Sequence, residues 1–237
     1  SWFSWSARLR ISANLEVLEK HDEAEALLRA MAKERPERTD ALTQLGGMIR
    51  AKERFADAVL VYDEAMARVK KVDQRHWPLL YARGIALERS KQWPRAEADF
   101  LRALELQPDQ AYVLNYLGYS WIDRGENLDR GMEMIRKAVE QRPNDGYIVD
   151  SLGWAHYRLG NYEKAAEHLE RAVELRPQDP TINDHLGDAY WKVGRLNEAR
   201  FQWKRAQGLK PDAELAEQIE KKLKEGMSAA APGKSGG

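Results

Sequence analysis

The side chains best suited to bind a ligand are aromatic rings interleaved with charged groups in the stretch from Gly146 to Arg158. Large rigid rings contribute contact area at low entropic cost and are frequent hot spots of binding. Carboxylates between them add charge selectivity. These side chains are Tyr147, Asp150, Trp154, Tyr157 and Arg158. Their types predict recognition of another molecule rather than a catalytic reaction.

Residues that commonly serve catalysis or metal binding are too scattered to form a site. The chain has no cysteine, which excludes disulfides, thiol nucleophiles and thiolate metal sites. No two histidines have the i, i+4 spacing of a zinc-binding helix. The five histidines are His21, His76, His156, His168 and His185. We therefore predict no catalytic centre, no metal site and no cofactor, and we expect His156 to pack in the core.

Charge and hydropathy limit the classes of partner. Lys and Arg total 38 and Asp and Glu also total 38, so the formal net charge is zero. Nucleic acids and anionic membranes normally require a basic excess or a basic stripe, which the sequence lacks. No apolar run approaches the length of a membrane span. The sequence therefore predicts no nucleic-acid partner and no direct membrane insertion, while 43% hydrophobic residues support a packed core.

The elements that must position these residues follow from an internal repeat. Glycine recurs at intervals of 38, 34, 35 and 34 residues, and small residues and prolines keep the same step. The glycines are Gly46, Gly84, Gly118, Gly153 and Gly187; the small residues are Ala24, Ala58, Ala96, Gly131, Ala165 and Ala199; the prolines are Pro36, Pro108, Pro143, Pro177 and Pro211, with Lys70 where another would fall. Apolar spacing of three and four predicts two amphipathic helices in each unit.

The repeated glycine predicts close packing of the two helices in a unit. Glycine inside a helix costs about 1 kcal/mol relative to alanine, so its recurrence at one place needs a packing reason. We expect the small residues of the second helix to face it. Gly125, Gly160 and Gly194 fall between the helices, where a left-handed residue ends a helix. Asp179 and Asp212 are expected to cap the helices that follow them.

The Leu-Gly, aromatic, alanine and proline series at a 34-residue period resembles the tetratricopeptide repeat over roughly residues 5–211. The resemblance implies an all-α, right-handed α-solenoid of about six helix-turn-helix units with a C-terminal capping helix. The predicted units are residues 5–38, 39–72, 77–110, 111–145, 146–179 and 180–213, and the cap is 213–226, in a single solenoid over 1–226. Residues 73–76 form an insertion between the second and third units. Residues 227–237 are predicted to be a disordered tail.

Three aromatic residues, Trp2, Phe3 and Trp5, stand at the start of the sequence without the polar cap that normally ends a stack of repeats. Two interpretations are open. The rings cover this end of the stack, or they pack against earlier repeats of a longer parent chain, and we favour the second. Self-association through the N-terminal face is a further hypothesis.

In the repeat family the first helix of each unit lines a concave groove, so the resemblance implies which residues face a partner. The predicted partner-binding residues are Tyr81, Tyr112, Asn115, Tyr119, Tyr147, Asp150, Trp154, Tyr157, Arg158, Asp184, Asp188 and Trp191. The alternative for several of the rings is packing on neighbouring helices.

The carboxylates in this set limit the kind of partner. Asn115 fits the family's clamp for C-terminal carboxylates, but Asp150, Asp184 and Asp188 would repel such a ligand. We therefore expect an extended or helical protein segment of neutral-to-basic character with apolar or aromatic anchors.

The leading hypothesis is a non-enzymatic scaffold or adaptor that holds partner segments in the groove of the C-terminal repeats. Residues 114–119 and 147–154 resemble bacterial proteins of this family, some of which are envelope lipoproteins that act as adaptors for periplasmic proteases. That resemblance implies the periplasm or cell envelope rather than the cytoplasm. The alternative is the helical arm of a larger enzyme whose catalytic domain lies on another segment. RNA binding is disfavoured by the zero net charge.

Overall fold

A computed structural model describes residues 2–227 of the chain, and the side chains of residues 4–227. Those residues form helices and connecting turns, with no strand among them. The chain divides after Asp109 into two compact units, called unit 1 and unit 2 below. The all-α class predicted from the period is confirmed. Continuity of one solenoid over residues 1–226 stays a prediction.

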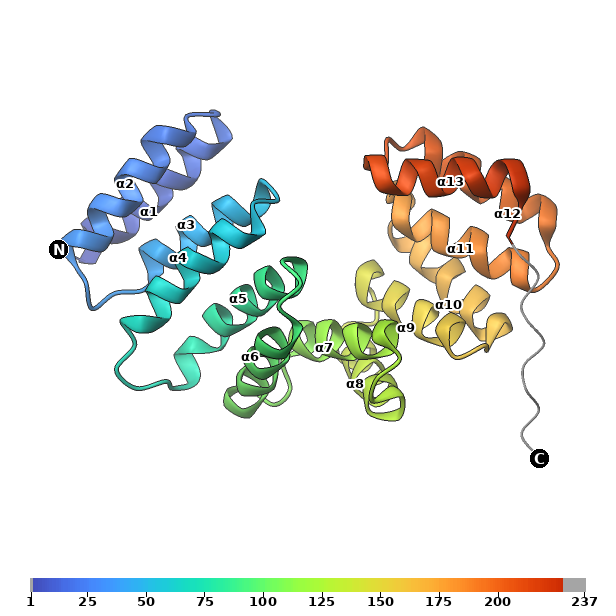
Figure 1. Cartoon of the computed structure of the whole chain (residues 1–237), viewed down its shortest axis with the longest axis horizontal. Helices are drawn as coiled ribbons and strands as arrows, with labels where there is room; N and C mark the ends of the chain where they lie inside the picture. Colours follow the sequence, from blue (N-terminus) through green and yellow to red (C-terminus); the bar gives the residue numbers. More distant parts are fainter. Residues whose placement is uncertain (1, 228–237) are drawn as a thin grey trace. The chain divides into compact units, whose positions relative to one another are not determined.

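Unit 1 contains three helix pairs and one short 3-10 helix (Figure 1). Its elements are α1 (Trp2–Val17), α2 (His21–Glu34), α3 (Asp40–Ala51), α4 (Phe55–Ala67), η1 (Gln74–His76), α5 (Trp77–Arg89) and α6 (Trp93–Leu106). The residues of the predicted insertion, 73–76, are ordered, and η1 occupies most of them.

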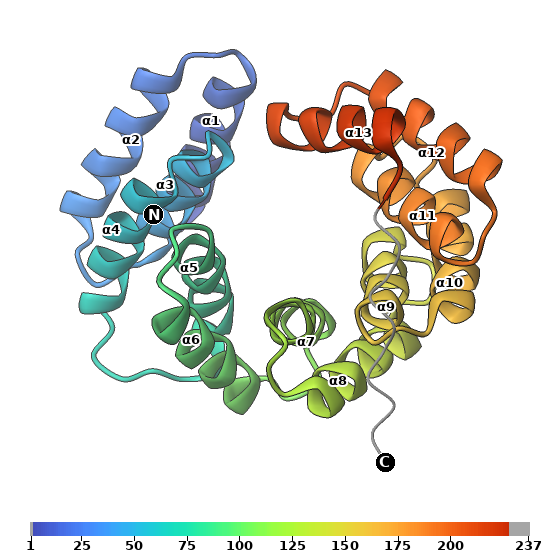
Figure 2. The ribbon, with the colours of Figure 1, turned by 45° about the vertical axis from the view of Figure 1, so that its right-hand side comes forward.

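Unit 2 contains three helix pairs and a final single helix, which Figure 2 shows next to α12. Its elements are α7 (Ala111–Arg124), α8 (Leu128–Gln141), α9 (Gly146–Arg158), α10 (Tyr162–Leu175), α11 (Pro180–Lys192), α12 (Leu196–Gly208) and α13 (Ala213–Glu225). Asp179 caps α11 by accepting from the Ile182 amide at 3.0 Å, and Asp212 caps α13 by accepting from the Leu215 amide at 2.9 Å. Both predicted caps are confirmed.

The repeated glycines lie where two helices of a pair approach closely, but the facing residue is mostly not the predicted one. A Cβ on Gly46, Gly84 or Gly187 would lie 2.4–2.6 Å from the ring of Tyr62, Phe100 or Trp203, respectively. The prediction of a small facing residue was wrong at these positions, because the missing Cβ makes room for a large ring that is then buried. Gly118 differs, because a Cβ on Gly118 would lie 2.7 Å from the carbonyl oxygen of Gly131, the small residue that was predicted to face it.

The turn inside each helix pair contains a left-handed residue in both units. Gly125, Gly160 and Gly194 have φ between 73° and 81°, as predicted. In unit 1 the corresponding residues are not glycines: Glu19, Glu53 and Lys91 have φ of 59°, 58° and 63°. The backbone of the turn therefore keeps one conformation whether or not glycine is present.

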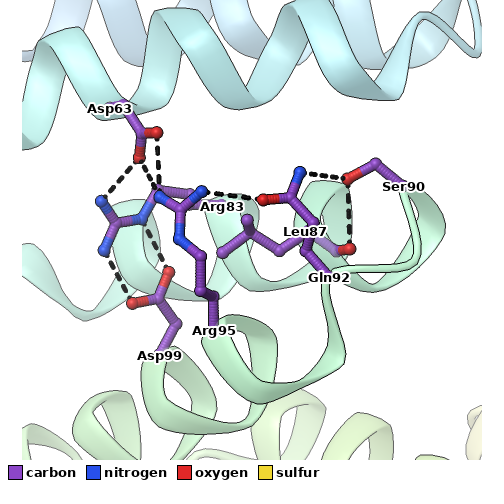
Figure 3. A network of polar contacts seen from close by, with 7 residues as sticks. All are labelled: Asp63, Arg83, Leu87, Ser90, Gln92, Arg95 and Asp99. Atoms are coloured by element: carbon purple, nitrogen blue, oxygen red, sulfur yellow. Dashed lines mark hydrogen bonds and ion pairs between the residues drawn. The ribbon is translucent and has the colours of Figure 1, made fainter.

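A closed ion-pair network joins the second and third helix pairs of unit 1 (Figure 3). Arg83 on α5 donates two hydrogen bonds to the buried Asp99 on α6, both at 2.7 Å, and one to Asp63 on α4 at 2.9 Å. Arg95 on α6 donates to both oxygens of Asp63, at 2.8 and 2.9 Å. Two arginines thus compensate two carboxylates, and they tie α4 to α5 and α6.

Residues near both ends of the chain pack more fully than expected. Trp5 is buried, donates to Asp40 at 2.9 Å and lies under the Arg38 guanidinium, so it packs on α3. Contact of this end with earlier repeats of a longer chain stays a hypothesis. Met227, the first residue of the predicted tail, accepts a hydrogen bond from Trp191 at 3.1 Å. Residues 228–237 of that predicted tail lie outside the described residues.

Candidate partner-binding surface

The centre of the surface is a stack of three rings on α9 and α11, the first helices of two successive pairs. The Trp154 ring lies 4.0 Å from the His185 ring and 4.7 Å from the Tyr157 ring, and both contacts are stacked. The Nδ1 atom of His185 lies 2.9 Å from the carboxylate of Asp150, which is buried. The stack and the ion pair together fix the position of the Trp154 ring.

The surroundings of His185 favour its charged form. Burial lowers its pKa, but the Asp150 carboxylate, with Asp184 and Asp188, more than offsets the burial and raises the pKa above the ordinary value. The His185 Nδ1–H therefore donates to Asp150, and the pair is a charged hydrogen bond in the interior.

Two further buried carboxylates on α11 share one lysine of the final helix. Lys222 on α13 lies 2.7 Å from Asp184 and 2.8 Å from Asp188. Asp188 also accepts from the Trp203 indole at 2.9 Å. The single helix α13 therefore supplies the cation for the carboxylates of α11.

Negative charge exceeds positive charge at this place. Burial and the neighbouring Asp184 raise the pKa of Asp188 to about 6, although Lys222 acts in the opposite direction. Burial is the largest cause of this shift, and the Lys222 ammonium offsets it only in part. An additional cation at this position would lower that pKa again.

A cavity of about 240 Å³ opens beside these groups. It is bounded by α9, α11 and α13, and its lining includes two cations, Lys222 and the charged His185, and four carboxylates, those of Asp184, Asp188, Asp212 and Glu214. Two buried atoms of its walls have no hydrogen-bond partner in the described part of the chain: Asp184 Oδ1 and Trp154 Nε1. Both atoms are themselves shielded from solvent, so the feature that the cavity presents to an entering molecule is the negative charge of its lining.

Comparison with known proteins identifies the repeat. Models of the tetratricopeptide repeat match residues 15–70 and 77–110, and a model of the TPR repeat matches residues 153–194, together more than half of the chain. The chain is a tetratricopeptide-repeat (TPR) protein. Its predicted fold, an α-solenoid of TPR units, is therefore confirmed.

Individual proteins agree with this assignment. TPR repeat-containing protein PA4667 of Pseudomonas aeruginosa is 34% identical over 87 residues, which cover 37% of this chain and 15% of that protein. The Cut9 and Hcn1 hetero-tetramer structure matches 93% of this chain and 42% of its own chain, with a TM-score of 0.77 and 15% identity. YrrB, described as a TPR protein with an unusual peptide-binding site, matches 82% of this chain and 97% of its own, with a TM-score of 0.54 and 18% identity.

Several predicted binding residues of this TPR protein are engaged with their own chain. Asp150, Asp184 and Asp188 are buried in the ion pairs described above. Trp191 contacts Trp203, with the ring centres 5.3 Å apart, and donates to the Met227 carbonyl. Contact of these residues with a partner stays a prediction. The three aspartates are buried and Trp191 is partly buried, so little of their surface is exposed.

Others lie nearer the surface. Tyr112 and Tyr147 are exposed, and each lies under an arginine at the end of its own repeat, Arg142 at 4.8 Å and Arg176 at 4.5 Å. Arg158 pairs with Asp123. The remaining predicted residues, Tyr81, Asn115 and Tyr119, are partly buried; the Tyr81 ring lies between those of Trp77 and Phe100. The residues brought together are therefore Asp150, Trp154, Tyr157, Asp184 and Asp188.

The sequence reading missed His185, Lys222 and Thr181 as parts of this surface. A signal existed for Lys222, which follows Asp188 by 34 residues and so occupies the same place in a seventh first helix. His185 likewise follows its partner Asp150 by 35 residues, one repeat later. Opposite charges or polar groups one period apart meet because successive first helices stack.

The described residues offer no group of three or more His, Asp or Glu placed to hold a metal ion. Within that same range, no helix has both the length and the apolar character to cross a bilayer.

Proposed function

We propose that this TPR protein is a scaffold or adaptor that binds a segment of a partner protein on unit 2, and that the segment inserts a lysine or arginine into the cavity beside Trp154. TPR units generally mediate protein–protein interaction, and stacked repeats present extended binding surfaces. YrrB, with the same fold, has a peptide-binding site.

The observation that supports this proposal is the unequal charge of the cavity. Two cations, Lys222 and the charged His185, face four lining carboxylates, and burial together with the neighbouring Asp184 raises the pKa of Asp188 to about 6. A cationic side chain of the partner would supply the missing charge, and its apolar stem would pack against Trp154 where that residue lines the cavity. Apolar or aromatic residues on either side of that lysine or arginine would contact Tyr157, which is the outer ring of the stack.

Thr181 provides a variant that fills the cavity without disturbing the core. It is exposed and lines the cavity. Thr181→Lys places a cation where we expect that of the partner, so binding should weaken by competition and by repulsion. The matched control is Gln207→Lys, which adds the same charge at an exposed position on α12.

The measurement is binding of wild type and both variants to an array of random 15-residue peptides. We expect the peptides that wild type retains to be enriched in Lys or Arg next to an apolar residue. Thr181→Lys should lose most of that signal and Gln207→Lys should keep it. Retained peptides without basic enrichment, or equal binding by the two variants, would contradict the proposal.

A further inference from the structure

A second cavity, of about 720 Å³, lies in unit 1 at the connections between helix pairs. One wall is the connection from α2 to α3, residues 37–40, and the other comes from the connection from α4 to α5, residues 68–76. We call it the η1 pocket. Its volume is within the range of about 300–1,000 Å³ that is usual for ligand sites.

The η1 pocket exists because the sequence departs from the repeat here. Lys70 stands where the other units have their closing proline, and residues 73–76 are inserted. The insertion is held by a capping box: the Asp73 carboxylate accepts from the Arg75 amide at 3.0 Å, and the His76 ring accepts from the Asp73 amide at 3.1 Å. Gln74 also bonds to Gln107, which directly follows α6, at 2.7 Å. The wall is therefore a fixed structure.

The lining carries an excess of positive charge, with five basic residues against three carboxylates. Each carboxylate already has an arginine partner: Asp40 pairs with Arg38 at 2.6 Å, Asp73 with Arg75 at 2.8 Å, and Glu37 with Arg35 at 3.8 Å. Lys70 and Lys71 are exposed and form no ion pair with any carboxylate of the described residues. The excess charge therefore rests on these two lysines.

We propose that the η1 pocket binds an acidic segment of a partner protein, whose Asp or Glu side chains pair with Lys70 and Lys71. The arginine forks that would grip a phosphate in bidentate fashion are taken by internal carboxylates, as with Arg38 on Asp40 and Arg75 on Asp73. Lysines on flexible stems instead meet successive carboxylates of a peptide as separate point charges. This site is independent of the cavity proposed for a basic segment on unit 2.

The test uses the full chain and a fluorescein-labelled hexaglutamate peptide, with binding followed by fluorescence anisotropy at low salt. The variant is Lys70→Glu/Lys71→Glu. The matched control is Lys33→Glu/Lys91→Glu, which makes the same change in net charge at exposed positions of unit 1. We expect the first pair to weaken binding by at least about tenfold and the control by less than about twofold, because reversed charges repel only at the site itself.

Two further measurements, cross-linking of the peptide and titration with triphosphate, separate the possible outcomes. Carbodiimide cross-linking of the peptide to wild type, followed by mass spectrometry, should place cross-links on Lys70 or Lys71 rather than on Lys33 or Lys91. Sodium triphosphate is titrated in parallel. No binding of the peptide, equal loss in both charge-reversed variants, or lysine-dependent binding of triphosphate in place of the peptide would each overturn the proposal. Circular dichroism verifies that the variants are folded.

Discussion

The two units bury carboxylates in different ways. In unit 1, Arg83 and Arg95 compensate Asp63 and Asp99, so the numbers of cations and anions match. In unit 2, Lys222 alone serves both Asp184 and Asp188. The unit 1 network is complete and acts as an internal brace. The unit 2 network lies beside a cavity whose lining has more carboxylates than cations, which is the arrangement expected where a cationic ligand completes the charge balance.

The turns inside the helix pairs also differ between the two units. Unit 2 has glycine at the left-handed position of each helix pair, where positive φ is free of Cβ strain. Unit 1 has Glu19, Glu53 and Lys91 there, and a side chain in this conformation is disfavoured. All three turns within the helix pairs of unit 1 thus depend on a non-glycine left-handed residue, whereas in unit 2 Asn127 alone accompanies the glycines of these turns, and the excess of buried carboxylates lies in unit 2. Variants that exchange these features between units can separate the two effects.

The largest expected effect is at Lys222. Lys222→Ala removes the cation that forms ion pairs with the buried Asp184 and Asp188, and we expect it to lower the free energy of unfolding by about 3 kcal/mol. Arg95→Ala in unit 1 should cost no more than about 0.5 kcal/mol, because Arg83 still pairs with Asp63 and Arg95 is half exposed. Urea denaturation measures both.

Lys224→Ala is the control for changes to α13 itself, since Lys224 pairs only with the exposed Glu220. It should behave like Arg95→Ala. Equal losses for Lys222→Ala and Arg95→Ala would show that the unit 2 carboxylates do not depend on one cation.

A smaller effect is expected from pH, through His156 on α9. His156 is buried, as predicted, and burial lowers its pKa to about 4 from an ordinary value near 6.5. The unfolded chain therefore takes up a proton before the folded chain does. The stability that depends on the neutral ring is complete above about pH 6.5 and is lost as the pH falls toward 4, with a magnitude on the order of 2 kcal/mol.

The measurement compares wild type with His156→Phe by urea denaturation at pH 7 and pH 4.5, and wild type should lose more stability than the variant. Asp188 changes in the other direction. Because its folded pKa, about 6, is above the ordinary 3.8, its own contribution to stability grows as the pH falls through 6. The difference between wild type and His156→Phe removes this background. An identical pH dependence of both proteins would refute the assignment to His156.

The smallest expected effect is at the turns. Gly160→Ala should lose about 1 kcal/mol, since no atom lies within 4 Å of the added Cβ and the cost is that of a left-handed alanine. Lys91→Gly should gain about 0.5 kcal/mol, because relief of strain exceeds the entropy lost by glycine. Thermal unfolding of the two variants gives both signs. A loss with Lys91→Gly would mean that its side chain, not its backbone, governs the turn.

Much of the fold follows from the sequence because small residues and prolines restrict the backbone directly. The period identified the helix pairs, and the glycines of the unit 2 turns identified their left-handed residues. Glu19, Glu53 and Lys91 gave no such signal, because the same backbone is imposed there by packing and not by residue type. The rings that fill the space over Gly46, Gly84 and Gly187 were also missed, since nothing local indicates which distant side chain covers a glycine.

The candidate surface was predicted less completely. Trp154 and Tyr157 were identified as aromatic residues of a first helix, and the structure brings them together with Asp150. Burial of the three carboxylates was not foreseen. It depends on His185 and Lys222, which lie one period away and have meaning only as partners across the stacking interface.

The dependence of α11 on Lys222 bears on how such arrays can be edited. A terminal helix is commonly regarded as a generic cover that any amphipathic segment replaces. Here it is matched to one particular predecessor, because it contributes the counter-charge for two acids that its neighbour has placed in the interior. An engineered array that replaces α13 therefore has to replace α11 as well, so that the two acids and their counter-charge stay together.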